Sequence, residues 1–168
     1  AKNAALLALA AAPLLVPFVV LGVALFLLFS ALGIPRSLVT VAAGHSVIAL
    51  PYAAFILVSR MIGLDPALED AAMDLGATEW EAFCKITLPL ARPAIISGAL
   101  LAFTVSFEDF VTSFFIAGIG IVTMPVKIYS MMKFGVTPEI NALATCLLGI
   151  TITFLALQHF LNQRSRLG

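Results

Sequence analysis

Residues 70–89 read DAAMDLGATEWEAFCKITLP, and this polar stretch decides how the rest of the chain is interpreted. It carries five of the eighteen charged side chains in the protein, but the segments on either side of it are strongly apolar. Local sequence rules predict two short helices joined at a glycine within it. The stretch therefore looks like a polar connection between two membrane-spanning segments.

The ends of both short helices have recognisable signals. Asp65 is expected to cap the first helix, and Gly76 is expected to end it in a left-handed conformation that costs glycine no Cβ clash. Thr78 and Glu81 form a T-x-x-E pattern that is typical of the start of a second helix. Leu88-Pro89 is expected to end that second helix, because a residue before proline disfavours the helical conformation.

The same stretch resembles the EAA loop of the membrane subunits of binding-protein-dependent ABC importers. That loop reads E-A-A, three residues, G, nine residues, I-x-L-P, and its spacing matches throughout. The matching residues are Asp70 (in place of glutamate), Ala71, Ala72, Gly76, Ile86, Leu88 and Pro89. The resemblance implies a coupling helix that docks onto a cytoplasmic ATP-binding subunit. The alternative, a solvated helical hairpin without a partner, is disfavoured by the flanking apolar segments.

The composition is that of a membrane protein. Hydrophobic residues make up 62% of the 168 positions and charged residues 11%, against about 45–50% and about 25% in soluble domains. A net charge of zero gives no field that would attract nucleic acid. The two cysteines, Cys84 and Cys146, fall in different segments and form no metal or redox motif. We expect no catalytic residues, no metal site and no cofactor, and therefore no enzyme.

We predict an all-α polytopic membrane bundle, similar to a type I ABC importer permease, that forms a single domain over residues 1–168. About 20 apolar residues cross a bilayer as a helix. The four expected spans are residues 6–32, 38–59, 93–118 and 140–161, and the coupling loop covers about residues 60–92. Pro13 and Pro17 predict a kink in the first span. Members of the family usually have about six spans, so the resemblance implies that the first one or two hairpins of the permease are missing.

The positive charges predict the orientation of the chain. Four spans would place six lysines and arginines on one side (Lys2, Arg60, Lys85, Arg92, Arg164 and Arg166) and three on the other (Arg36, Lys127 and Lys133). Cytoplasmic loops carry the excess of these residues. The EAA-like loop and the C-terminus are therefore predicted to be cytoplasmic.

Two adjacent acids, Glu108 and Asp109, are the candidate residues of a substrate pathway. They lie about 15 residues into the third expected span, or ~22 Å along a helix. A carboxylate at that depth is costly unless it faces a partner or a wet cavity. Consecutive helical residues point about 100° apart, so one acid can line a pathway while the other pairs within the protein. A purely structural pair is the alternative. His45, in the second span, is expected to be a neutral residue that hydrogen-bonds to a neighbouring helix; a role in substrate or proton transfer is the alternative.

Within the family, the sequence is most like permeases for spermidine and putrescine. The likeness is carried by SFEDFVTSFF at 106–115 and by MPVKIYSMMKFGVTPEINALAT at 124–145. The resemblance implies polyamine import across the inner membrane. The implied partners are an ATP-binding subunit, a second permease subunit, a periplasmic solute-binding protein and membrane lipid. Two alternatives remain: an importer of another solute such as iron(III) or a small organic ion, and an ion-coupled secondary transporter. An ion-coupled secondary transporter is expected to contain an inverted repeat, and we see no convincing repeat in this sequence.

Overall fold

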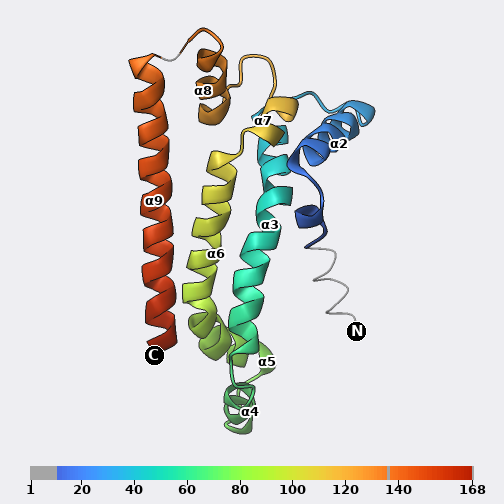
Figure 1. The fold of residues 1–168 in the computed structure, drawn as a ribbon. Helices are drawn as coiled ribbons and strands as arrows, with labels where there is room; N and C mark the ends of the chain where they lie inside the picture. The colour runs from blue at the N-terminus through green and yellow to red at the C-terminus, as the bar shows by residue number, and fades with distance from the viewer. Residues whose placement is uncertain (1–10, 136, 168) are drawn as a thin grey trace.

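The computed structural model describes residues 11–135 and 137–167, the last seven as backbone only. Every regular element in this part of the chain is a helix. Three long helices run side by side along the molecule: α3 (Leu38–Ile62), α6 (Leu88–Glu108) and α9 (Pro138–Leu167) (Figure 1). Together with the membrane composition, this arrangement confirms the predicted all-α membrane bundle.

Three helices in the described part are long and apolar enough to cross a membrane. They cover Leu38–Ile62, Glu79–Glu108 and Pro138–Phe160. They correspond in order to the expected spans at 38–59, 93–118 and 140–161. α3 begins with a capping box in which Ser37 and Thr40 each accept a hydrogen bond from the other's backbone N–H. That cap explains why the second span begins where the sequence indicated.

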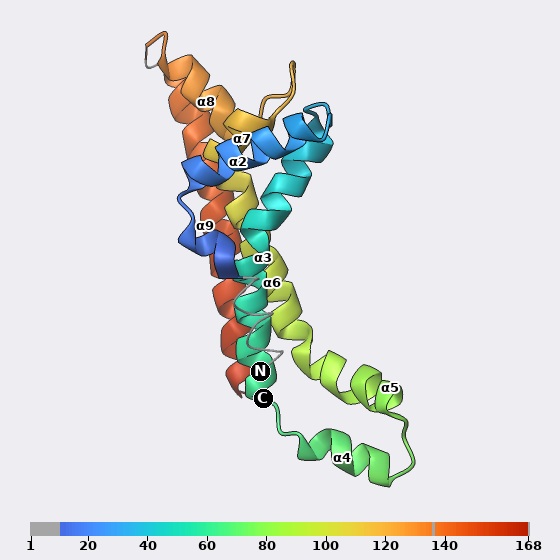
Figure 2. The same cartoon turned by 90° about the vertical axis from the view of Figure 1, so that its right-hand side faces the viewer.

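The first expected span, residues 6–32, is not one continuous helix. Its first five residues lie outside the described part. The remainder consists of a 3₁₀ turn, η1 (Ala12–Leu15), an extended Val16, and then α2 (Phe18–Ala31). Pro17 forces this break, because Val16 before it is extended and proline has no N–H to continue a helix. The 14 residues of α2 extend only ~21 Å, too short to cross a bilayer, and Figure 2 shows α2 lying across the long helices.

The expectation that Leu88-Pro89 ends the second loop helix is wrong. The helix runs on from α5 (Glu79–Ala82) through a π-helical stretch, η2 (Phe83–Thr87), directly into α6. The N–H of Leu88 bonds to the carbonyl of Phe83, five residues back. A π-helical turn widens the helix, which accommodates the ring and the missing N–H of Pro89. The helix that contains the third span therefore begins within the loop rather than at Pro93.

The third span also ends earlier than residue 118. α6 stops at Glu108, Asp109 is extended, and a short helix, α7 (Val111–Ile116), follows. α8 (Met124–Met132) comes next and leads to α9 through Gly135, whose φ is +108°. The break at Asp109 places both candidate acids at the end of a helix rather than inside one.

The capping signals in the loop are confirmed. The Asp65 carboxylate accepts a hydrogen bond from the N–H of Ala67 at the start of α4 (Ala67–Asp74). Gly76 has a φ of +93°. Thr78 and Glu81 exchange the two hydrogen bonds of a capping box. α4 and α5 project from one end of the bundle, where the C-terminal end of α9 also lies, while α2, α7 and α8 lie at the other end (Figures 1 and 2).

Small residues let α3 and α6 approach closely. A Cβ added to Gly98 of α6 would lie 3.4 Å from the carbonyl oxygen of Ala53 in α3. Ala94, one turn earlier, is buried. At the opposite end, a cluster of buried apolar side chains joins three helices: Leu25 and Phe29 of α2, Val41 of α3 and Ile116 of α7. This cluster holds α7 against the bundle next to the candidate acids.

Candidate functional site

Asp109 occupies the break between α6 and α7 and caps the helix that follows. Its Oδ1 accepts a hydrogen bond from the N–H of Thr112 at 3.3 Å, and its Oδ2 accepts one from the N–H of Ser113 at 2.9 Å. An aspartate that bonds to the backbone a few residues ahead competes with continuation of the preceding helix. This competition explains why α6 ends where a long apolar helix was expected.

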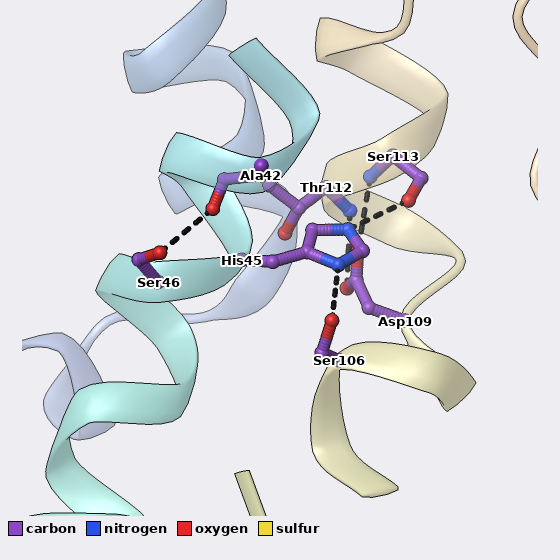
Figure 3. Close-up of polar contacts among 7 residues, drawn as sticks. All are labelled: Ala42, His45, Ser46, Ser106, Asp109, Thr112 and Ser113. Carbon is purple, nitrogen blue, oxygen red and sulfur yellow. Dashed lines mark hydrogen bonds and ion pairs between the residues drawn. The ribbon is translucent and has the colours of Figure 1, made fainter. Parts of the chain in front are cut away.

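His45 of α3 reaches across to this break. Its Nδ1 lies 2.7 Å from the Ser106 hydroxyl oxygen, and its Nε2 lies 2.8 Å from the Ser113 hydroxyl oxygen (Figure 3). The same Nε2 lies 3.2 Å from Oδ2 of Asp109. The side chains of His45 and Asp109 are 11% and 8% exposed. The prediction that His45 hydrogen-bonds to a neighbouring helix is confirmed, and the structure adds an acidic partner.

Glu108 points away from this cluster. It is exposed and lines a groove of about 640 Å³ between the end of α6, α8 and α9. The other lining residues are Pro125, Ile128, Tyr129, Met132, Ala144, Leu147 and Leu148. The ring of Tyr129 packs at a tilt of 45° against that of Phe110, with ring centroids 4.7 Å apart. The two adjacent acids therefore face different surroundings: Asp109 pairs within the protein, and Glu108 faces an open groove with an aromatic wall.

A second hollow lies beside His45, between α3, α6 and the start of α8. It is open to solvent, with about 760 Å³ of free space, and its wall is mostly apolar, with His45, Ser106 and Thr123 as polar members. The hydroxyl groups of Ser106 and Ser113 were not predicted from the sequence to be partners of His45. A serine about one helical turn on either side of Asp109 is the signal that could have indicated them.

The residues that match the EAA pattern fall into two groups. Asp70, Ala71 and Gly76 lie exposed on α4 and the turn after it, and Ala72 is half-buried there. Ile86, Leu88 and Pro89 lie where the π-helical stretch passes into α6, and Ile86 is half-buried against the end of α3 and α4. The pattern thus covers both the projecting part of the loop and the point where the loop joins a span.

Exposed apolar side chains mark the projecting part of the loop. Leu75 is 90% exposed and Trp80 is 71% exposed. Trp80 stacks on Phe83 with ring centroids 5.6 Å apart. Exposed apolar groups rimmed by charge are typical of a protein interaction site. Trp80 therefore faces outward from the loop.

Two side chains tie the loop to the spans. The Thr87 hydroxyl donates a hydrogen bond to the Glu69 carboxylate, which joins α4 to the π-helical stretch. Arg60, at the end of α3, donates from Nε to the carbonyl oxygen of Leu90 at 3.2 Å. A displacement of α4 would therefore be transmitted to the base of α6 and the end of α3.

Charge is also ordered within the loop. The N–H of Thr78 donates to the Glu81 carboxylate at 3.1 Å, and Lys85 lies 3.1 Å from the same carboxylate. Chiefly through the Thr78 N–H and then through Lys85, the pKa of Glu81 falls from its ordinary value of 4.5 to about 2. Among the described residues, no group of three or more histidine, cysteine, aspartate or glutamate side chains could hold a metal ion.

Comparison with known proteins matches almost the whole chain to one protein family. The family described as "Binding-protein-dependent transport system inner membrane component" matches residues 2–167. The chain is 48% identical over 144 residues to the putrescine transport system permease protein PotI of Escherichia coli (strain K12), an overlap of 82% of this chain and 51% of PotI.

Two further relatives carry the name spermidine/putrescine transport system permease protein PotC. The protein from Haemophilus influenzae is 39% identical over 149 residues, covering 89% of this chain and 58% of the relative. The protein from Escherichia coli (strain K12) is 43% identical over 136 residues, covering 81% of this chain and 52% of the relative. The chain spans about half the length of the curated relatives it matches.

Proposed function

The chain belongs to the family of binding-protein-dependent transport system inner membrane components, and on that premise we propose that it helps form the translocation pathway of an ATP-driven polyamine importer. Relatives that are 39–48% identical are named for putrescine or for spermidine and putrescine transport. In this proposal the chain is multi-pass in the inner membrane, with its C-terminus in the cytoplasm. ATP hydrolysis belongs to a separate subunit.

The loop at residues 60–92 couples the pathway to that ATP-binding subunit. The support comes from the EAA pattern at Asp70–Pro89 and from the outward-facing Leu75 and Trp80. Closure of the ATP-binding subunits would move α4. The Glu69–Thr87 hydrogen bond would pass that movement to the base of α6. A second permease subunit completes the pathway, and a solute-binding protein delivers the cargo from outside.

Glu108 is the residue that faces a cationic cargo. The observation that carries this assignment is its exposed carboxylate at a groove that also contains Tyr129. A polyamine ammonium group that leaves water needs an anionic or carbonyl partner. An aromatic face attracts the same ammonium group. Asp109 has a structural role at the break next to Glu108, because its carboxylate is already paired with His45 and with backbone N–H groups.

Uptake of labelled spermidine and putrescine tests the proposal in cells that express the full-length permease with its partner subunits. Wild type should import polyamine. Glu108→Gln should lower the apparent affinity for the cargo while the complex still assembles, and Asp109→Asn should impair uptake through the distorted break. If the wild-type complex imports no polyamine but uses ATP to import another solute, the importer assignment stands and the polyamine assignment is wrong.

A further inference from the structure

The imidazole of His45 bridges the discontinuity between α6 and α7. Its hydrogen bonds reach Ser106 in the last turn of α6, Asp109 in the break, and Ser113 in the first turn of α7. Figure 3 shows the ring between the two helix ends. One side chain on α3 therefore contacts residues before, within and after the break.

The hydrogen-bond partners define the roles of the two ring nitrogens. An ionised Asp109 can only accept, so we assign a hydrogen to Nε2, which faces both Oδ2 of Asp109 at 3.2 Å and Oγ of Ser113 at 2.8 Å. In a neutral imidazole the other nitrogen, Nδ1, is then an acceptor, and the Ser106 hydroxyl donates to it. Both nitrogens of a buried ring are thus satisfied, and breaking either bond would leave a buried polar group unpaired.

A second contact fixes α7 to the same helix. Thr40 of α3 donates from its hydroxyl to the carbonyl oxygen of Ile116 at 3.0 Å. A Cβ on Gly44 would lie 2.3 Å from Cδ1 of Ile116, which shows how closely α3 and α7 pack here. α7 is therefore held to α3 near both of its ends, and His45 provides the connection from that unit back to α6.

We propose that His45 is a positioning residue for the cargo site: by clamping Ser106, Asp109 and Ser113 together, it fixes the direction in which the neighbouring Glu108 carboxylate faces the groove. The proposal rests on the proposed function. Glu108 is the last residue of α6 and lies directly before the clamped Asp109, so any change in the break rotates or shifts its carboxylate. His45 itself makes no contact with the cargo in this arrangement.

Substitutions at His45 separate its two hydrogen-bonding sides. In His45→Gln, the amide group extends to about the position of Nε2 and can still donate toward Asp109. In His45→Asn, the shorter amide reaches only about the position of Nδ1 and can retain the Ser106 contact. His45→Leu removes both. His159→Gln, at the other histidine of the chain, is the matched control and should leave uptake unchanged.

The measurement is the apparent KM and Vmax of labelled spermidine uptake, normalised to the amount of complex that co-purifies with the ATP-binding subunit. We expect KM to rise about tenfold or more in His45→Leu, the size expected when a hydrogen bond to a charged group is lost. His45→Gln and His45→Asn each keep one side of the clamp, so their KM values should lie between those of wild type and His45→Leu. Because His45 acts through Glu108, His45→Leu should add little to KM in a Glu108→Gln background.

The outcomes are separable. An unchanged KM in His45→Asn and His45→Leu, with only the amount of assembled complex reduced, would overturn the inference and make His45 a residue of the fold alone. Additive effects in the double variant would overturn it as well. If wild type imports no polyamine, the proposed function fails and this inference fails with it. If His45→Leu does not assemble, His45→Asn keeps a polar side chain and decides the question.

Discussion

Asp109 lies beside three donors from two segments, and this environment explains how a carboxylate stays buried at the end of a membrane helix. The donors are the N–H groups of Thr112 and Ser113 and the Nε2 of His45. A buried charge without such partners would cost several kcal/mol. The sequence predicts that two adjacent acids point about 100° apart, but not which acid turns inward. The serines and His45, 61–68 positions apart in the chain, decide it.

The shifted pKa of Glu81 predicts how the cap of α5 responds to pH. The folded value of about 2 lies below the ordinary value of 4.5. The stabilisation is therefore fully present above pH 4.5 and is lost as the pH falls through about 2. An NMR titration of the Glu81 carboxyl in the reconstituted chain should give a midpoint near 2, and Lys85→Gln should raise that midpoint. A wild-type midpoint near 4.5 would contradict the cap.

Gly118 is predicted to tolerate no side chain. A Cβ at this position would lie 2.2 Å from the carbonyl oxygen of Arg36, a backbone atom that cannot turn aside. Gly118→Ala should therefore separate the two loops at this end of the bundle and lower the stability by about 2 kcal/mol, within the range for overpacking. Thermal unfolding of the detergent-solubilised protein measures the effect.

The matched control for Gly118→Ala is Gly149→Ala in α9. No atom lies within 4 Å of a Cβ added at Gly149. Alanine in place of glycine inside a helix is favourable by about 1 kcal/mol. The midpoint of unfolding should stay level or rise in this variant. Equal losses in both variants would mean that the close approach at Arg36 does not limit the stability.

At the scale of helices, boundaries with a local capping signal are predictable from the sequence, and boundaries that depend on distant contacts are not. The start of α3, the turn at Gly76 and the capping box at Thr78 all follow from nearby residues. The end of α6 does not, because it depends on the distant His45 and on the cap that Asp109 forms. The passage through Pro89 was also not predictable from helix rules, since a π-helical turn removes the conflict on which those rules depend.

The hairpin of α4 and α5 depends on the left-handed conformation of Gly76. Its φ of +93° is strained for any L side chain and most of all for a β-branched one. Gly76→Val should misorient α4 relative to α5, weaken co-purification of the ATP-binding subunit, and reduce uptake at least severalfold. Gly63→Ala is the control at the start of the loop, because Gly63 has an ordinary φ of −85°. Normal assembly and uptake in Gly76→Val would mean that this turn has no role in coupling.

At the scale of the whole molecule, composition and span length were enough to predict a membrane bundle. They were not enough to predict how many helices are long enough to cross the membrane. The described residues contain three helices long and apolar enough to cross a membrane, and the shorter α2 packs against α7. Most of the apolar surface of α9 is exposed, including Leu148 and Ile152. Such exposed apolar surface suits contact with lipid or with another protein.

The arrangement of the spans makes a testable prediction about orientation. α3 descends to the loop, α6 rises from it and α9 descends again, so the loop and the C-terminal end of α9 lie together (Figure 1). Arg60, Lys85 and Arg92 lie toward that end, and Lys127 and Lys133 lie on or beside α8 at the other. Because the excess of positive charge stays in the cytoplasm, the end that carries α8 should face outward.

Single cysteines report this orientation directly. In a Cys84→Ser/Cys146→Ser background, Lys127→Cys on α8 should react with a membrane-impermeant maleimide in intact cells. Asp74→Cys on α4 should react only after the membrane is permeabilised. Both positions are exposed, so a difference in labelling reflects the side of the membrane and not burial. The reverse pattern would place the EAA-like loop outside, where no ATP-binding subunit could reach it, and the coupling proposal would be wrong even though the family assignment stands.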